Sequence, residues 1–393
     1  MERDRPLVAT GQQIGAGWSP ALSVVKALSA LVLARKLGGE AVYWMADEDH
    51  DRLEVASVVG LEAGRLRRHR FHFEAPEGTA AGWLPWTAAH QAEAADLWGA
   101  LPEAVETTLR GHALALGAPL WRRGLRPFSP TDPAVRAPIQ DTLARWRELP
   151  LEAALLRQAQ RLRNEGAPLP LDPSAQAAWF SLDPDRGRRR RLEPGQPLAQ
   201  GHWLSPGAVL RPLMQSLLLP VTHAVLGPAE RAYWRLAEPL WEAVGLAPPV
   251  IVPRPTVYVL PPGARLEAEQ VPALRDGLWE AFAPDLPLRP SAALGQPQPL
   301  PEWSPALRIR FTAEVARLRQ RLLRLDRRLA RGQAEASLGM DPERLRQALF
   351  PLGKAQERVL PGCLWLRDEV LLDRIARALE GPDPLLLVPG TGP

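Results

Sequence analysis

The chain has 393 residues, of which 46% are hydrophobic and 23% are charged, and its formal net charge is +4. This is a globular composition, and the length predicts more than one structural unit. No stretch approaches the roughly 18 uncharged apolar residues of a membrane span, and no targeting signal is recognised at the start. The single cysteine, Cys363, excludes an intrachain disulfide, so we expect a cytoplasmic protein that does not enter a membrane.

The first fifty residues predict a strand, a helix and a second strand. The first strand begins at Leu7, and the long apolar helix has Ser19 as its N-cap and Pro20 as its first residue. Gly38 ends this helix, and residues 41–46 form a short buried strand. The pattern predicts a parallel β-α-β unit of an open α/β sheet, in which a ligand binds beyond the carboxyl ends of the strands.

A glycine-rich turn follows the first strand. Glycine lets a ligand approach the backbone, and glutamine side chains supply amide donors and acceptors. The free N–H groups of a helix that starts at Ser19 would favour a phosphate or a carboxylate. Lys26, in the second turn of this helix, either reaches the bound anion or is exposed. The turn matches neither the dinucleotide-binding pattern nor the P-loop. The predicted anion-binding residues are Thr10, Gly11, Gln12 and Gln13.

Four ionisable side chains follow the second strand directly: Glu48, Asp49, His50 and Asp51. A carboxylate beside a histidine can orient the ring and raise its basicity, which favours acid–base catalysis by Asp49 and His50. The carboxylates can also hold Mg²⁺. The alternative is a helix start, where an aspartate caps the helix and acids favour its dipole. Glu48 and Asp51 are included among the predicted binding residues.

Other candidate groups carry weaker signals. His69, His72 and His223 lack the spacing of zinc ligands, so no metal ligand is assigned. Cys363 has no histidine motif near it and is expected to be a small buried or semi-exposed residue rather than a nucleophile. The densest basic run, residues 186–191, is interpreted as a solvated loop, with an anion or nucleic-acid contact as the alternative.

Helical segments joined by prolines dominate residues 76–195, which we interpret as a helical insertion rather than a continuation of the sheet. Strands are predicted again at residues 224–226 and 250–252, with an amphipathic helix over residues 230–244 between them. Residues 253–303 hold many prolines and are interpreted as a connecting segment.

A heptad pattern of apolar residues predicts a coiled coil within residues 304–350. Gly332 interrupts the pattern, and a second helix is expected to start at Pro342. The stripe is either half of a homodimer interface or the core of a hairpin in which the segment from Pro342 covers it. Further on, residues 385–388 predict a strand that returns to the sheet. The stripe consists of Phe311, Val315, Leu318, Leu322, Leu325 and Leu329.

Several motifs in a fixed order resemble the bacillithiol biosynthesis cysteine-adding enzymes. That family's TGQQ turn and EDHD sequence are both present near the N-terminus. Residues 210–215 resemble its L-R-P-L-x-Q, residues 227–234 its G-P-x-E-x-A-Y-W, and residues 249–254 its P-V-I-x-P-R. Residues 349–351 and 356–359 resemble L-F-P and Q-E-R-V. The motifs cover both ends and the centre of the chain.

The resemblance implies a Rossmann-like core with insertions and a dimerising coiled coil. It also implies a ligase for the last step of bacillithiol biosynthesis, which joins the carboxyl group of L-cysteine to the amine of glucosaminyl malate. Activation of the cysteine carboxylate by ATP is the implied route. The turn at residues 10–13 would hold an anionic group, while Asp49 and His50 would deprotonate the amine or place a metal. The sugar-malate side would be lined by Arg211, Gln215, Tyr233 and Trp234.

We therefore expect an α/β fold with a Rossmann-like parallel-sheet core, a helical insertion and a coiled-coil arm. Two alternative functions are an adenylate-forming ligase that acts on another acid, and a coiled-coil dimer that binds nucleic acid through its arginines. The EDHD cluster disfavours the second, because a scaffold does not need it. The core would comprise residues 1–75, 196–252 and 351–393, with the insertion at 76–195, the Pro-rich connection at 253–303 and the arm at 304–350.

Overall fold

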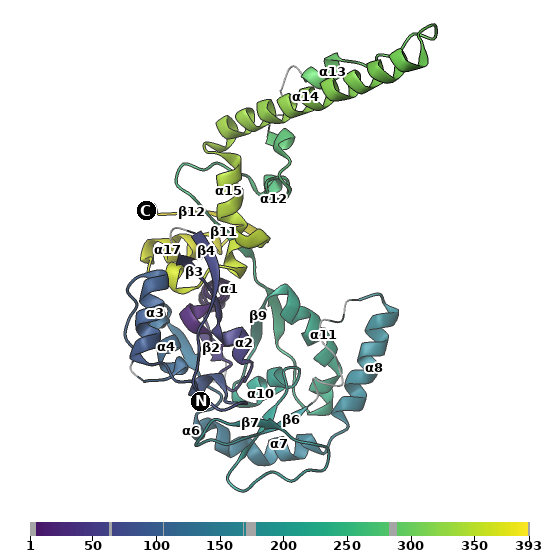
Figure 1. Cartoon of the computed structure of the whole chain (residues 1–393). Coiled ribbons are helices and arrows are strands. Elements are labelled where there is room, and N and C mark those ends of the chain that lie inside the picture. The colour runs from purple at the N-terminus through teal and green to yellow at the C-terminus, as the bar shows by residue number, and fades with distance from the viewer. Residues whose placement is uncertain are drawn as a thin grey trace. The chain divides into compact units, whose positions relative to one another are not determined.

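The computed structural model describes residues 5–62, 65–104, 106–167, 169, 178–282 and 289–391. The chain divides into two compact units (Figure 1). The first is formed by residues 1–257 and 357–386, and the second by residues 258–356 and 387–393. Among the described residues, no helix has the length and apolar character that a membrane crossing requires.

A five-stranded parallel sheet forms the centre of the first unit, which confirms the predicted α/β fold. Strand β1 is central and pairs on one side with β2, in a register that places Leu7 opposite Glu40. Its other neighbour is β9. The later strands therefore lie on both sides of β1, with β2 and β5 on one side and β9 and β10 on the other. The strand order is β10 (Val250–Pro253), β9 (His223–Leu226), β1 (Leu7–Gln12), β2 (Glu40–Met45) and β5 (Leu125–Phe128).

Side-chain alternation divides the sheet into two buried faces. Ala9, Trp44 and Leu226 face a core built with the helices α7 (Gln140–Arg147), α8 (Leu151–Asn164), α10 (Arg211–Leu218) and α11 (Pro228–Ala243). The opposite face is covered by α1 (Leu22–Leu37), which also packs against α17 (Glu369–Ala378). Helix α1 is buried along most of its length, as a helix that covers a sheet must be.

The boundaries of α1 agree with the prediction at one end only. Gly38 ends the helix in the left-handed conformation, with φ 64°, as predicted. The predicted start is wrong, because the helix begins at Leu22 and Ser19 has extended backbone without a side-chain cap bond. The Ala21 N–H donates to Leu360 O at 2.7 Å. This N–H is therefore not available to a bound anion.

The segment between β2 and β9 is less purely helical than predicted. The expectation that residues 76–195 do not continue the sheet is wrong, because β5 pairs with β2. An antiparallel hairpin, β3 (Ser57–Glu62) with β4 (Arg65–Arg70), precedes it, and α2 (Arg52–Ala56) leads into that hairpin. A three-stranded antiparallel sheet has the order β7 (Arg189–Arg191), β6 (Trp179–Leu182), β8 (Trp203–Pro206). The remaining helices here are α3 (Ala88–Trp98), α4 (Leu109–Leu116), α5 (Ala118–Arg122) and α6 (Pro133–Arg136).

The second unit contains the longest helix, α14 (Pro305–Leu338), of 34 residues. The predicted interruption at Gly332 is wrong, since the helix continues through this residue, whereas α15 (Pro342–Leu349) starts as predicted. Part of the apolar stripe is covered by the preceding segment, where Trp303 packs edge-on against Phe311 with ring centroids 5.2 Å apart. That segment contains α12 (Val271–Asp276), η5 (Trp279–Phe282) and α13 (Pro290–Ala293).

The predicted last strand exists but does not join the five-stranded sheet. Strand β12 (Leu385–Pro389) pairs with β11 (Thr256–Leu260) in a separate two-stranded sheet. The expectation that it returns to the core sheet is therefore wrong. The short helix α16 (Cys363–Leu366) precedes α17, and Cys363 is buried, as expected.

Candidate active site

A cavity of about 290 Å³ lies at the carboxyl ends of β1 and β9. This is the topological switch point, where the strand order changes direction on either side of β1. Open α/β sheets bind their ligands at this position. Helices α10 and α11 supply its other walls. Most of the predicted site residues line it, namely Thr10, Gly11, Gln12, Gln13, Asp49, Arg211, Gln215, Tyr233 and Trp234. The predicted residues Lys26, Glu48, His50 and Asp51 do not.

The predicted turn is wrong for Thr10, Gly11 and Gln12, which are paired residues at the end of strand β1. Contacts to the neighbouring strands fix this segment. Thr10 Oγ1 donates to Val225 O at 3.0 Å, so this hydroxyl ties β1 to β9. A Cβ atom at Gly11 would lie 2.5 Å from Trp44 O, a separation that real Cβ atoms do not show. Glycine is therefore needed here for the close approach of β1 to β2 rather than for a ligand.

Lys26 contacts the end of β1 and is fully buried. Its Nζ donates to Gly11 O, to Gln12 Oε1 at 3.1 Å and to Glu230 Oε1 at 2.6 Å. Burial lowers the pKa of Lys26, and Glu230 opposes this effect. Glu230 Oε2 also accepts from the Gly227 N–H at 2.8 Å. In this structure Lys26 holds the end of β1 and Glu230 in place instead of reaching into the cavity.

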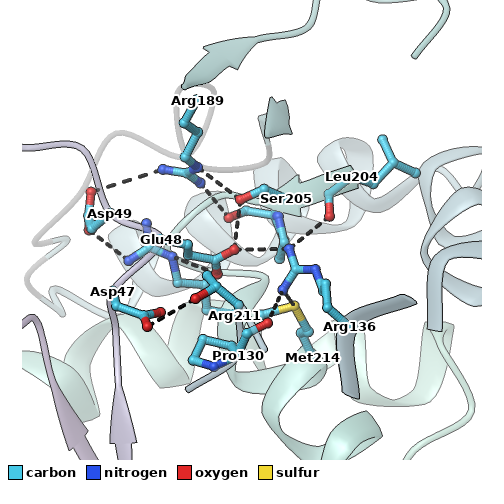
Figure 2. Close-up of polar contacts among 12 residues, drawn as sticks. Asp47, Glu48, Asp49, Pro130, Arg136, Arg189, Leu204, Ser205, Arg211 and Met214 are labelled. Carbon is cyan, nitrogen blue, oxygen red and sulfur yellow. Dashed lines mark hydrogen bonds and ion pairs between the residues drawn. The ribbon is translucent and has the colours of Figure 1, made fainter. Parts of the chain in front are cut away.

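Glu48 is fully buried and does not line the cavity; Figure 2 shows it among the arginines that it contacts. Its Oε2 accepts from Arg136 Nη2 at 2.9 Å and from Ser205 Oγ at 2.8 Å, and its Oε1 lies 3.7 Å from Arg211 Nε. Burial alone would raise the pKa of Glu48, but the three arginines 136, 211 and 189 lower it. Glu48 is therefore an ionised structural group that fixes the surrounding arginines.

Asp49 is the member of the EDHD cluster that lines the cavity. Arg211 Nη1 donates to its Oδ2 at 2.7 Å, and Arg189 Nη1 lies 4.0 Å from its Oδ1. Burial would raise the pKa of Asp49, but Arg211 and Arg189 hold it well below its usual range. Asp51, by contrast, caps α2 by accepting from the Glu54 N–H at 3.0 Å. The helix-start interpretation is thus confirmed for Asp51.

His50 is half-buried beside the cavity. Arg189 Nη1 donates to His50 Nδ1 at 3.1 Å. Because a guanidinium group only donates, Nδ1 must be the unprotonated nitrogen, and the neutral ring carries its proton on Nε2. Burial and the neighbouring Arg189 lower the pKa of His50. With Nδ1 engaged by Arg189 and the proton on Nε2, the ring can donate a hydrogen bond but has no free nitrogen to accept a proton. The predicted role of His50 as a base therefore has no support in the geometry.

Arg189 is a site residue that the sequence interpretation missed. Its side chain is 2% exposed, so the interpretation of residues 186–191 as a solvated loop is wrong at this position, although Arg186 is 81% exposed. The guanidinium lies 3.8 Å from the centroid of the Phe180 ring and donates to Ser205 Oγ and to Pro206 O. Burial lowers the pKa of Arg189 to about 9. The available signal is the apolar strand at residues 179–182, which predicts a hairpin partner for the basic run.

Arg136 was also missed, since nothing near it in the sequence marks it. Besides Glu48, it donates to Leu204 O at 2.8 Å and contacts Met214 Sδ at 2.7 Å. Arg136, Arg189 and Arg211 thus surround two carboxylates, Glu48 and Asp49. The cavity is also lined by the carboxylates of Glu54 and Glu230, so its wall combines the guanidinium of Arg211 with several acidic groups.

Asp47, one residue before the cluster, is fully buried. Its Oδ2 accepts from Ser129 Oγ at 2.6 Å and from Thr131 Oγ1 at 3.0 Å, and Arg110 Nη1 lies 3.6 Å away. Burial raises the pKa of Asp47 to about 6, and these three contacts only partly oppose that rise. The pKa values of Asp47 and Asp49 are therefore shifted in opposite directions, although the two residues lie only two positions apart in the sequence.

A magnesium site does not fit these contacts. Within the described ranges, no group of three or more histidine, cysteine, aspartate or glutamate side chains is arranged to hold a metal ion. The carboxylates of Glu48 and Asp49 face arginines, and Asp51 caps a helix.

Comparison with known proteins decides the family. Residues 197–255 match a model described as the N-terminal Rossmann-like domain of the bacillithiol biosynthesis protein BshC. A protein of Thermus thermophilus, named "Putative cysteine ligase BshC", is 30% identical over 94% of this chain and 86% of its own length. The chain belongs to the BshC family. It is therefore an enzyme of the ligase class.

Other BshC relatives agree. The homologue from a second strain of T. thermophilus has the same 30% identity and the same coverage of both chains. The homologue from Symbiobacterium thermophilum is 31% identical over 65% of this chain and 57% of its own length. The matched residues 197–255 include β10, and they include α10, α11 and β9, which form one side of the cavity.

Proposed function

We propose that this BshC protein catalyses the last step of bacillithiol biosynthesis, in which the carboxyl group of L-cysteine is joined to the amine of glucosaminyl malate. The observation that carries the proposal is the cavity at the carboxyl ends of β1 and β9, with Arg211 and Asp49 side by side in its wall. A substrate with two carboxylates and an amine fits a site that combines the guanidinium of Arg211 with the carboxylates of Asp49, Glu54 and Glu230.

Helices α10 and α11 suit the sugar-malate part of this substrate. Arg211 is the cation among the residues that line the cavity; its buried Nε lies 3.7 Å from Glu48 Oε1 and makes no hydrogen bond with the residues that the structure describes. A malate carboxylate would bind near it. Gln215 supplies an amide for sugar hydroxyl groups, and Tyr233 and Trp234 supply aromatic surface. The segment at residues 10–13 would bind the remaining anionic group.

Amide formation from a free carboxylate requires that the carboxylate be activated first. ATP, as the resemblance implies, would supply a phosphoryl-based leaving group when bound. A guanidinium group fits a phosphate oxygen, and Arg211 is the member of the arginine cluster that lines the cavity. Within the chain itself, Asp49 and Glu48 orient Arg211 toward the ligand, and Lys26 keeps the end of β1 in place.

Mass spectrometry of the purified protein tests the reaction. Incubation with glucosaminyl malate and cysteine should give bacillithiol, and omission of ATP should abolish the product if the carboxyl is activated by ATP. Serine in place of cysteine is the matched substrate control. If no adduct forms but another acid is joined to an amine, the alternative of a ligase for a different acid is correct.

We also propose that α14 forms a homodimer through its apolar stripe. Leu318 and Leu329 remain 44% and 42% exposed, although the preceding segment covers Phe311. Burial of such side chains is worth on the order of 1.5–3 kcal/mol each. Light scattering should give twice the chain mass for the wild type and a folded monomer for Leu322→Glu combined with Leu325→Glu. A monomeric wild type at micromolar concentration would leave the stripe as surface within one chain.

A further inference from the structure

The cavity needs a group that removes a proton from the attacking amine, and the carboxylates that line it are Asp49, Glu54 and Glu230. Two of them are engaged by cations. Asp49 accepts from Arg211 at 2.7 Å, and Glu230 accepts from Lys26 at 2.6 Å and from the Gly227 N–H at 2.8 Å. A carboxylate that is already bound to a fixed cation is a weak proton acceptor.

Glu54 differs from both. Over the part of the chain that the structure describes, no lysine, arginine or histidine nitrogen lies within 4 Å of its carboxylate. Its neighbour is the neutral amide of Gln13, whose Nε2 lies 2.8 Å from Oε2 and 3.2 Å from Oε1 in the orientation that satisfies both groups. Glu54 is on α2, and the cap bond from Asp51 fixes the start of this short helix at the rim of the cavity.

We propose that Glu54 is the general base of the ligase reaction, a role that rests on the function proposed above. The acyl donor is a cysteine carboxyl activated as a mixed anhydride with a phosphoryl group. The amine nitrogen attacks the carbonyl carbon, and a C–N bond forms while the C–O bond to the phosphoryl group breaks. The electron pair of that bond stays on the leaving oxygen, and the proton of the amine passes to a carboxylate oxygen of Glu54.

The charges around Glu54 suit this role. Partial desolvation raises the pKa of Glu54, although its side chain is exposed. The anionic neighbours Asp49 and Asp51 raise it further, and Arg211 opposes them. A carboxyl with a raised pKa is a better proton acceptor near neutral pH than Asp49, whose pKa is lowered. Gln13 then keeps the carboxylate directed toward the end of β1, which gives a glutamine of the TGQQ sequence a role in positioning the base.

The test compares wild type, Glu54→Gln and Glu54→Asp, with Glu62→Gln as a control for an exposed carboxylate outside the cavity. Bacillithiol formation is measured by mass spectrometry from about pH 5.5 to about pH 9. Glu54→Gln should lower kcat by about 100-fold or more, leave KM for glucosaminyl malate within about 3-fold, and remove the acidic limb of the kcat profile. Glu54→Asp should retain part of the activity, and Glu62→Gln all of it. An active Glu54→Gln variant with an intact acidic limb would overturn the assignment.

A second readout does not depend on turnover. Calorimetry of glucosaminyl malate binding, in buffers with different ionisation enthalpies, counts the protons exchanged on binding. The cationic amine should lower the pKa of a carboxyl that it binds beside, so at acidic pH wild type should release more protons on binding than Glu54→Gln. An equal count in the two proteins would show that the amine does not bind beside Glu54 and would overturn the assignment. If wild type binds glucosaminyl malate but forms no product, the proposed reaction fails while Glu54 is still judged by the proton count. If wild type does not bind it, both proposals are wrong.

Discussion

At the carboxyl edge of the sheet, the side chains of Arg136 and Arg189 are 0% and 2% exposed, and each is fixed by several partners. On α14, in contrast, Arg317 is 69% exposed and its partner is Glu314, three residues earlier in the same helix. A buried charge must be matched by neighbours because desolvation is costly, whereas an exposed ion pair contributes little. An arginine at the sheet edge is therefore held in one position by its partners and matters for stability, whereas an arginine on the surface of α14 contributes little.

The largest effect is expected at the buried pair of Arg136 and Glu48. Arg136→Met removes the main partner of a fully buried carboxylate, and the loss of one member of such a pair costs about 3–5 kcal/mol. Urea unfolding should show this loss of unfolding free energy. Arg186→Met, at an exposed arginine, is the matched control and should change stability by less than about 0.5 kcal/mol. An equal loss of unfolding free energy in the two variants would show that the buried arginine matters no more for stability than the exposed one.

The pH dependence of stability provides a second test at Asp47. Its pKa in the folded protein is about 6, above the ordinary value of 3.8, so the folded state binds the proton more tightly than the unfolded state. The contribution of Asp47 to stability is therefore greatest below about pH 4 and is lost as the pH rises through about 6. The loss amounts to about 3 kcal/mol, at about 1.4 kcal/mol for each unit of pKa difference.

Asp47→Asn keeps an oxygen for Ser129 and Thr131 but does not titrate. The variant should gain stability relative to wild type as the pH rises from about 4 to about 7, when urea unfolding is followed at each pH. Parallel stability curves for the two proteins would show that Asp47 does not titrate as described.

A smaller change in free energy, here of ligand binding, is expected from Arg211→Lys. Lysine keeps the positive charge but lacks the planar fork that binds carboxylates through two parallel hydrogen bonds. Titration of malate into the protein should give an affinity about 10-fold weaker, which corresponds to about 1.4 kcal/mol. Arg231→Lys, at an exposed position of α11 outside the cavity, should leave the affinity unchanged. Equal malate binding by wild type and Arg211→Lys would place the anion site elsewhere.

The smallest effect is expected on α14. Arg317→Gln removes an exposed pair with Glu314 and should change the unfolding free energy by no more than about 0.5 kcal/mol. The measurement is again urea unfolding at neutral pH. A loss above about 1.5 kcal/mol would mean that Arg317 has a partner beyond its own helix, and the contrast with the buried arginines of the sheet edge would then be smaller than described.

The features that the sequence predicted are those with local causes. The β-α-β unit follows from the apolar run between two strands and from Gly38, which ends α1 in the left-handed conformation. The cavity follows from Asp49 and Arg211, which lie in recognisable motifs. Arg136 and Arg189 were not predicted, because Glu48 and His50, which they contact beside the cavity, lie 88 and 139 residues away, and nothing local distinguishes the two from exposed arginines. The strand β5 was missed because its pairing with β2 is equally remote in sequence.

The contact between the start of α1 and the segment near residue 360 has a consequence for biosynthesis. Ala21 N–H donates to Leu360 O, and Gly362 N–H donates to Trp18 O, while α17 covers part of the same helix. A ribosome that adds about 5–20 residues per second completes the intervening segment about 15–70 s after Ala21 is made. During this interval one face of the newly made sheet and helix lacks its cover. We expect stalled or truncated chains to be recognised by chaperones through this exposed apolar surface.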